Sequence, residues 1–254
     1  MDTQNIKVIA HRGSNKAAPQ NTMPAFYLAA EEGADGFETD VHLSKDGVPV
    51  ICHNPTIDAT SNGVGEIISY TLAELKQFDF GKGHGEEYSN TPMPTLDEFL
   101  TFAGESDTEI INIELKCPKG DRAPLVDTVI REINRHNICD RVIISSFSPY
   151  ILYRVRQLAP ACQTGFLYPS NHFSVCRPVF YMPYILAKRV GATALHPAHP
   201  LVNKAVVAAA HSMGLKVNVW TVNEASVVKR LAACGVDGII TDCPGYIKGI
   251  LKSL

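Results

Sequence analysis

The chain has 254 residues, of which 45% are hydrophobic and 19% are charged, so it can bury a sizeable core and intrinsic disorder is not expected. The formal net charge of −3 and the lack of a basic run argue against nucleic acid or an anionic membrane surface as a partner. No apolar run approaches the length of a membrane span, and no signal peptide precedes the first strand pattern. We therefore expect a cytoplasmic protein without a membrane anchor.

The seven cysteines are scattered along the chain, and no two of them form a Cys-x-x-Cys pair. Their odd number and irregular spacing argue against a disulfide framework and against a thiolate metal cluster. We expect reduced cysteines, several of them small core residues, in a reducing compartment.

Residues 1–53 predict a strand, a helix, a second strand and a hairpin partner. Thr22 is a candidate N-cap, because apolar residues at helical spacing follow it. Residues 45–47, Lys-Asp-Gly, form a turn signal, so the next run should pair back on the second strand. The expected bounds are Lys7–Ala10 for the first strand, Met23–Glu32 for the helix, Gly36–Leu43 for the second strand and Val48–His53 for its partner.

Residues 54–93 do not continue this succession of strands and helices, because they are rich in Gly, Asn, Thr and Ser and contain one helical stretch, Thr71–Phe78. The segment still carries aromatic residues, which a free linker does not need. We expect an insertion after the second strand that packs on the mouth of the main domain.

From Thr95 onward, predicted helices and strands alternate strictly and bring the total to eight strand–helix units. The expected helices are Leu96–Ala103, Arg122–His136, Pro149–Leu158, Val179–Val190, Val202–Met213 and Glu224–Ala233, followed by a short final helix. The expected strands are Glu109–Lys116, Arg141–Ser146, Gln163–Leu167, Ala192–His196, Lys216–Val222 and Gly238–Thr241.

This alternation predicts a parallel sheet with right-handed crossovers. Eight units in roughly 250 residues match a (β/α)8 TIM barrel. A doubly wound open sheet is the alternative, but no Gly-x-Gly-x-x-Gly follows the first strand. We therefore expect an α/β fold in which residues 1–254 form one TIM-barrel domain with an insertion at about 54–93.

Ionisable side chains stand at one common end of otherwise apolar strands. Active sites of such barrels lie at the carboxyl ends of the strands, so this distribution predicts a catalytic mouth. The ionisable strand-end residues are His11 and Arg12, Glu38 and Asp40, His53, and Glu114 and Lys116, and a further strand ends in Trp220 and Thr221.

Glu38, Asp40 and Glu114 form a three-carboxylate set that suits Mg²⁺ or Ca²⁺, because hard cations prefer oxygen ligands. Arg12 and Lys116 would be cations beside that metal. Their expected target is an anionic substrate group, and phosphate suits a planar fork together with a point charge.

His11 and His53 titrate near neutral pH, so they can act as a general base and a general acid. Cleavage of a phosphodiester needs such a pair, because one proton leaves the attacking oxygen and another reaches the leaving alcohol. A metal would offset the charge of the transition state.

These residues resemble the glycerophosphodiester phosphodiesterase family, in its bacterial, soluble, TIM-barrel type. The resemblance implies metal-dependent cleavage of glycerophosphodiesters to glycerol 3-phosphate and an alcohol, in a barrel with a small insertion after strand two. The shared motifs, in chain order, are His11-Arg12-Gly13, Asn21-Thr22, Glu38-x-Asp40, His53 after the Lys-Asp-Gly turn, Pro94-Thr95-Leu96, Ile113-Glu114-x-Lys116 and Trp220-Thr221-Val222-Asn223. By position, the resemblance assigns acid–base catalysis to His11 and His53, metal binding to Glu38, Asp40 and Glu114, phosphate binding to Arg12 and Lys116, and the glycerol pocket to Trp220.

Three positions depart from the family pattern. Gln20 stands where the family usually has Glu, Asn54 where an Asp commonly follows the histidine, and Ala59 where an Arg is often found. Gln20 removes a negative charge near the site, and the other two changes bear on the orientation of His53 or of the phosphate.

Other polar residues are expected to be structural. His196 and His199 stand at the end of the strand expected over Ala192–His196, and we expect them to serve a loop there and not catalysis. We expect Asp242 to cap the final helix, and His42 and His84 to be exposed. Aromatic residues cluster between positions 166 and 184, where they would form either a wall for the leaving alcohol or a surface patch for self-association.

Several alternatives stay open. The same site could hydrolyse lysolipids as a lysophospholipase D does, Lys116 could form a Schiff base in a lyase or aldolase, or the barrel could bind phosphorylated ligands without catalysis. The attacking group could be metal-bound water or the neighbouring glycerol hydroxyl. The oligomeric state, the identity of the metal and the preferred alcohol are also open.

Overall fold

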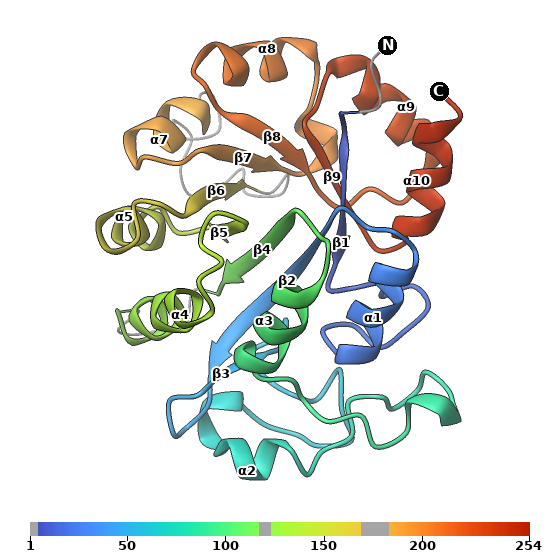
Figure 1. Ribbon diagram of the computed structural model, residues 1–254, viewed down its shortest axis with the longest axis vertical. Coiled ribbons are helices and arrows are strands. Elements are labelled where there is room, and N and C mark those ends of the chain that lie inside the picture. The colour runs from blue at the N-terminus through green and yellow to red at the C-terminus, as the bar shows by residue number, and fades with distance from the viewer. Residues whose placement is uncertain (1–4, 117–122, 169–182) are drawn as a thin grey trace.

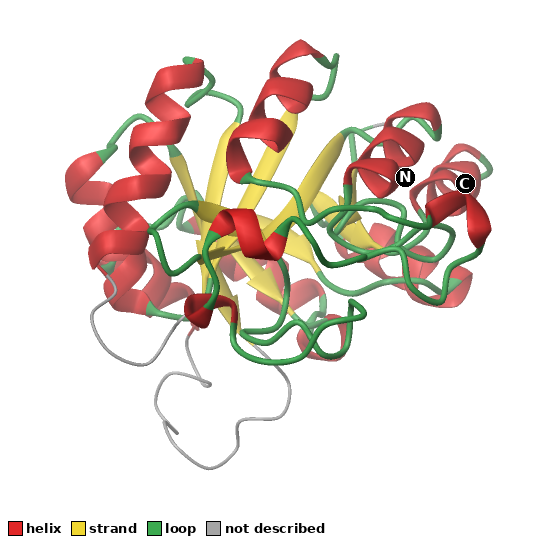
Figure 2. Cartoon of the chain, turned by 90° about the horizontal axis from the view of Figure 1, so that it is seen from below, coloured by secondary structure: helices red, strands yellow, loops and turns green. Residues whose placement is uncertain are grey.

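The computed structural model describes residues 5–116, 123–168 and 183–254. In this part of the chain, eight parallel strands close into a barrel inside a ring of helices (Figures 1 and 2). β1 pairs with β2 on one side and with β9 on the other, which closes the ring and confirms the expected TIM barrel. The ring strands are β1 (Lys7–His11), β2 (Gly36–Leu43), β4 (Ile110–Leu115), β5 (Val142–Ser146), β6 (Gln163–Tyr168), β7 (Ala194–Pro197), β8 (Lys216–Val219) and β9 (Gly238–Thr241). A further strand, β3 (Pro49–Ile51), pairs antiparallel with β2 outside the ring, as the hairpin signal predicts.

The helices follow the strands around the barrel in chain order (Figure 1). Local signals fix several of their ends: Thr95 starts α3 with a reciprocal capping box to Glu98, and Ser148 caps α5. The first residues of the helix expected at 179–190 lie outside the described residues. The helices are α1 (Met23–Glu31), α3 (Leu96–Glu105), α4 (Ala123–His136), α5 (Pro149–Leu158), α7 (Pro183–Arg189), α8 (Lys204–Ser212), α9 (Ala225–Cys234) and α10 (Pro244–Lys252).

Strand alternation separates the apolar core from the interior of the barrel. On β4, Ile111, Ile113 and Leu115 are fully buried in the apolar core, in one cluster with side chains of α3 and α4. The residues between them, Asn112 and Glu114, face the opposite side of the strand, toward the barrel axis. The same alternation on the other strands sends polar groups into the barrel and places the site at its mouth.

The inserted segment 54–93 forms a small apolar cluster with Val50 of β3 and with Cys52, and it lies beside β3, next to α1 and α3 (Figure 1). It contains the short helix α2 (Leu72–Leu75) and two 3₁₀ turns. The Tyr88 hydroxyl donates to the carbonyl of Ala17, in the loop that follows β1 at the carboxyl end of the barrel. The segment therefore packs against the rim, in agreement with the sequence. Its cluster comprises Val50, Cys52, Ile57, Ile67, Leu75, Phe80 and Met93.

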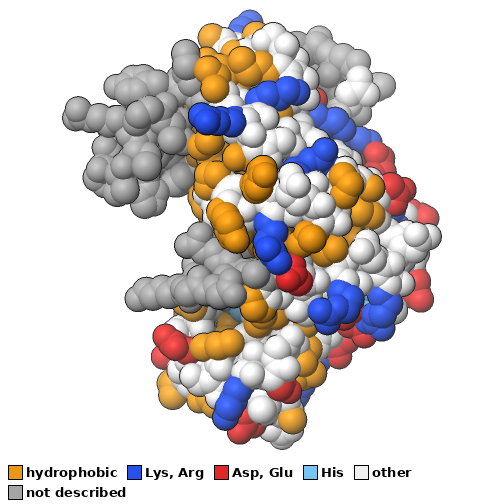
Figure 3. Space-filling model, turned by 90° about the vertical axis from the view of Figure 1, so that its left-hand side faces the viewer, with side chains coloured by type: hydrophobic (Ala, Val, Ile, Leu, Met, Phe, Trp, Pro, Cys, Tyr) orange, Lys and Arg blue, Asp and Glu red, His pale blue; other side chains and the backbone are white. Residues whose placement is uncertain are grey.

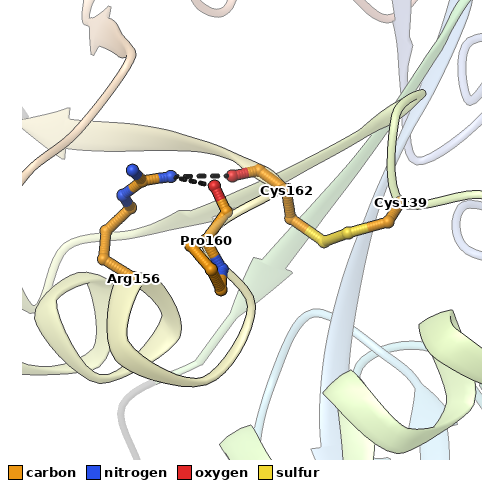
Figure 4. Close-up of a disulfide and its surroundings, with 4 residues drawn as sticks. All are labelled: Cys139, Arg156, Pro160 and Cys162. Atoms are coloured by element: carbon orange, nitrogen blue, oxygen red, sulfur yellow. Dashed lines mark hydrogen bonds between the residues drawn. A yellow bond between two sulfur atoms is a disulfide. The ribbon is translucent and has the colours of Figure 1, made fainter.

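Cys139 and Cys162 form a disulfide, with their Cα atoms 5.0 Å apart (Figure 4). The expectation that the cysteines stay unpaired is wrong for this pair. The physical reason is topological: β5 and β6 are neighbouring parallel strands, so the crossover through α5 brings the segments before the two strands together. Arg156 donates to the carbonyl of Cys162 and to that of Pro160. Among the other described cysteines, Cys52, Cys234 and Cys243 are free, whereas Cys117 and Cys176 lie outside the described residues.

Hydrophobic side chains are scattered among lysines and arginines on the face shown in Figure 3. Of the aromatic residues between 166 and 184, Phe166 and Tyr168 are buried in the apolar core and stack on each other. Phe173, Phe180 and Tyr181 lie outside the described residues, so the two roles suggested for this group stay predictions. None of the helices in the described ranges is long and apolar enough to cross a membrane.

Candidate active site

Three buried carboxylates converge at the carboxyl ends of β2 and β4. Glu38 and Asp40 share one face of β2, and Asp40 lies opposite Glu114 in the β2–β4 register. One oxygen from each carboxylate lies within 4.8 Å of the others. The structure thus brings together the three residues that the sequence singles out.

The charges of these carboxylates are strongly coupled. Burial and the nearby Asp40 raise the pKa of Glu38 well above its ordinary value, and they raise that of Glu114 to about 7. Burial also acts to raise the pKa of Asp40, but Lys116 and Arg12 outweigh it and hold this pKa below its ordinary value. The cluster therefore needs positive charge before all three groups ionise.

Two cations already contact the cluster. The Lys116 ammonium lies 2.7 Å from Asp40 Oδ1 and 2.6 Å from Glu114 Oε1. Arg12 Nε lies 3.3 Å from Asp40 Oδ2, and its Nη1 donates to Gln20 Oε1 at 2.6 Å. The neutral amide of Gln20 thus orients Arg12 without cancelling its charge.

The three carboxylates fit a hard divalent cation. Their ligand atoms are all oxygen and they are buried. Burial and, after it, repulsion from Asp40 raise the pKa values of Glu38 and Glu114, and a bound cation would offset both effects. A second group, Asp97, Glu132 and His136, lies on the outer helices α3 and α4. There Arg135 forms ion pairs with Asp97 and Glu132, which accounts for that cluster without a metal.

His11 ends β1 and is held by a carboxylate. Its Nδ1 lies 2.6 Å from Asp242 Oδ1, which also accepts from Asn15, while Asp242 Oδ2 accepts from Asn223. Burial lowers the pKa of His11, and the bond to Asp242 acts in the opposite direction. The expectation that Asp242 caps the last helix is wrong, because the N-cap residue of α10 is Cys243.

His53 follows β3 and is held by an amide, because its Nδ1 lies 2.7 Å from Asn54 Oδ1. Burial lowers the pKa of His53 to about 4. His42 is buried, with its Nε2 3.2 Å from the His53 carbonyl, so the expectation that it is exposed is wrong. His84 is exposed, as expected.

His196 lies within β7, in agreement with the expected strand, but it is fully buried in the barrel, so the loop role expected for it is wrong. Asn218 on β8 donates to its Nε2 at 3.1 Å, and a Cβ on Gly165 would come within 2.6 Å of its ring. His199 lies in the connection after β7, as expected, in a short 3₁₀ turn. Neither histidine lines the cleft described next.

A cleft with a volume of about 90 Å³ at the mouth of the barrel joins these groups. One side carries the charged residues, and the other is apolar and aromatic. Trp220 donates through Nε1 to the His196 carbonyl and packs edge-on against Phe147, with ring centres 5.7 Å apart. The lining residues are His11, Arg12, Glu38, His53, Asn112, Glu114, Lys116, Ser145, Phe147, Leu167, Trp220, Thr221 and Ile240.

Sequence reasoning assigned no role in the site to two residues that hold it together. The first is Asp242. The second is Asn21, whose Nδ2 donates to Asp40 Oδ2 at 2.8 Å while its Oδ1 accepts from Thr39. The Asn-Thr step before the first helix marks this position in the sequence, but it does not reveal that the side chain reaches a strand two elements away.

A closed barrel with convergent carboxylates and two histidines at the carboxyl ends of its strands defines a TIM-barrel enzyme. Residues 11–246 match the model of the glycerophosphoryl diester phosphodiesterase family. The chain belongs to this family, so the expected family and enzyme class are confirmed.

Relatives match along most of their length. A glycerophosphodiester phosphodiesterase of Caldanaerobacter subterraneus subsp. tengcongensis is 39% identical over 245 residues, which are 96% of this chain and 97% of the relative. One from Bacillus altitudinis is 34% identical over 240 residues, 94% of this chain and 95% of that protein. A phosphodiesterase of Oleispira antarctica, solved with its product sn-glycerol-3-phosphate, is 29% identical with a TM-score of 0.87 and covers 98% of both chains.

Proposed function

We propose that this protein hydrolyses glycerophosphodiesters to glycerol 3-phosphate and an alcohol. The observation that carries the proposal is the meeting of three carboxylates, two cations and two histidines around one cleft. The product bound to the Oleispira relative supports the same substrate class.

In this proposal, Glu38, Asp40 and Glu114 hold Mg²⁺ or Ca²⁺. The bound cation would neutralise negative charge on the phosphate oxygens during the reaction. Arg12 and Lys116 bind the phosphate, because both stand beside the carboxylates at the cleft wall. Each of them then shares its charge between Asp40 and the substrate.

His11 and His53 form the acid–base pair. We assign proton acceptance to His11, because the Asp242 carboxylate stabilises the imidazolium that forms. His53, held by a neutral amide, donates a proton to the leaving alcohol. The negative charge of a bound phosphodiester would raise the pKa of His53, opposing the effects of burial and of the nearby Lys116 and Arg12.

The organic part of the substrate would occupy the apolar side of the cleft. Trp220 would line the glycerol pocket, since its ring faces the cleft and is fixed by the bond to the His196 carbonyl.

The test is turnover of glycerophosphocholine, glycerophosphoethanolamine and a lysolipid, each with EDTA, Mg²⁺ and Ca²⁺. We expect release of glycerol 3-phosphate from the first two substrates in the presence of a divalent cation, and none with EDTA. Hydrolysis of the lysolipid alone would favour a lysophospholipase-D-like enzyme. Tight binding of glycerol 3-phosphate without turnover of any substrate would favour a phospho-ligand-binding barrel.

We further propose that residues 1–254 form one domain with its insertion at about 54–93, and that the protein works in the cytoplasm on a small-molecule substrate without a nucleic-acid partner. The Cys139–Cys162 disulfide of the structure would have to be reduced at this location, because the cytosol keeps most thiols reduced. Alkylation of thiols in intact cells, followed by mass spectrometry, would contradict this location if the pair were found oxidised.

A further inference from the structure

The floor of the cleft contains two buried polar side chains with unpartnered oxygens. Asn112 is 1% exposed and Ser145 is fully buried. Asn112 Oδ1 and Ser145 Oγ have no hydrogen-bond partner, yet both residues line the cleft. Buried polar groups in native proteins are nearly always hydrogen-bonded, so these two atoms indicate a partner that binds in the cleft.

Both residues adjoin the carboxylates. Asn112 lies opposite Glu38 in the β2–β4 register and two residues before Glu114 on the same face of β4. Ser145 lies opposite Glu114 in the β4–β5 register. Asn112 therefore lies deeper in the barrel than Glu114, and Ser145 lies beside Glu114 on the neighbouring strand. Both side chains border the space into which Glu38 and Glu114 point.

The missing partner must donate hydrogen bonds, because an amide oxygen only accepts them. The Lys116 ammonium, a donor at the same cleft, is already bonded to Asp40 and Glu114. The carboxylates offer no hydrogen once a bound cation keeps them ionised. A hydrated divalent cation does, because Mg²⁺ usually keeps several water ligands when it binds to carboxylates.

We propose that Asn112 and Ser145 accept hydrogen bonds from water molecules of the cation's hydration shell on the side that faces the barrel interior, and so determine how tightly the cation is held. The inference rests on the metal site of the proposed function. The depth of the two residues favours this role over contact with the substrate, since the aromatic side of the mouth is more open, with Phe147 39% exposed.

Calorimetric titration of Mg²⁺ and Ca²⁺ into substrate-free protein tests this role. Asn112→Leu removes the acceptor and should weaken cation binding about 10-fold to 100-fold, as loss of outer-shell partners commonly does. Asn112→Asp keeps an acceptor and adds negative charge, so it should bind the cation at least as tightly as the parent. Ser145→Ala should also weaken binding, and this small change disturbs the fold least.

The matched control is Asn218→Ala. Asn218 is a buried amide in the same barrel, but it is bonded to His196 and does not line the cleft, so the variant should keep the parental cation affinity. Circular dichroism and the Tm would establish that each variant is folded. If Asn112→Leu fails to fold, the cation affinities of Ser145→Ala and Asn112→Asp test the inference in its place.

Parental cation affinity in folded Asn112→Leu and Ser145→Ala would overturn the inference. It would be overturned equally if their cation affinity is unchanged while they bind glycerol 3-phosphate less tightly, because the side chains would then serve the substrate. Failure of the parent protein itself to bind either cation would overturn the proposed metal site as well, so the two failures are distinguishable.

Discussion

The two histidines of the cleft are held by side chains of different charge. Asp242 gives His11 a full carboxylate, which two asparagines keep in place, whereas Asn54 gives His53 only an amide oxygen. A carboxylate favours the protonated imidazole far more than an amide does. The same residue type therefore stands in two different electrostatic settings, which is the usual condition for separate acid and base roles.

Replacing Asp242 with Asn should lower kcat by roughly 10²–10⁴-fold, because His11 would lose the charge that stabilises its protonated form. KM should change little, since Asp242 does not line the cleft. Steady-state kinetics on glycerophosphocholine would measure both. Asp127→Asn is the control, because Asp127 forms a surface ion pair with Arg154 away from the cleft. An unchanged kcat in Asp242→Asn would refute the role given to Asp242.

Replacing either histidine with Ala should abolish turnover of glycerophosphocholine while leaving the Tm close to that of the parent. A substrate with a p-nitrophenol leaving group separates the two roles, because this group departs without needing a proton. His53→Ala should recover activity on that substrate, and His11→Ala should not. Equal loss in both variants on both substrates would contradict the assignment of His53 as the acid.

At the scale of elements, strand–helix alternation was sufficient to predict the barrel. The helix expected over Pro149–Leu158 has those bounds in α5, because Ser148 and Pro149 mark its start locally. Contacts across the closed ring could not be predicted in this way. Asp242 and His11 are 231 residues apart, and only the pairing of β9 with β1 brings them together. A helix cap was the best local interpretation of Asp242, and tertiary structure overrides it.

The Cys139–Cys162 disulfide could not be predicted from local sequence signals either, because the proximity of the two residues depends on the crossover through α5. It links the segments before β5 and β6, at the opposite end of those strands from the cleft. In the chain-entropy model, a bridge over 23 residues of sequence separation stabilises the fold by about 3.5 kcal/mol.

The double variant Cys139→Ser, Cys162→Ser should therefore unfold at lower urea concentration than the oxidised parent, with kcat unchanged at 25 °C. Urea titrations with and without dithiothreitol would measure the difference, and reduction should bring the parent close to the variant. Cys234→Ser, at a free cysteine, is the control. A parent protein indifferent to the reductant would contradict the bridge.

At the scale of the whole molecule, titratable groups inside the barrel make stability depend on pH with opposing signs. The folded state binds an extra proton at Glu114, whose pKa is raised to about 7 by burial and by Asp40, so acidification toward pH 4.5 favours folding through this group. His196 acts the other way. Burial lowers its pKa to about 3 from 6.5 in the unfolded chain, so acidification below pH 6.5 favours unfolding through it.

The contribution of His196 to the pH dependence of the unfolding free energy can be measured by comparing the parent with a His196→Gln variant. Between pH 7.5 and pH 5, it should remove about 2 kcal/mol from the free energy of unfolding, because the unfolded chain takes up a proton that the buried ring does not. His196→Gln keeps an acceptor for Asn218 but cannot titrate, so its unfolding free energy should fall less over this range than that of the parent. Urea unfolding of both proteins at several pH values gives the difference, with the exposed His84→Gln as control. Parallel pH profiles for the parent and His196→Gln would mean that the ring protonates in the folded barrel, which is incompatible with its burial between Gly165 and Asn218.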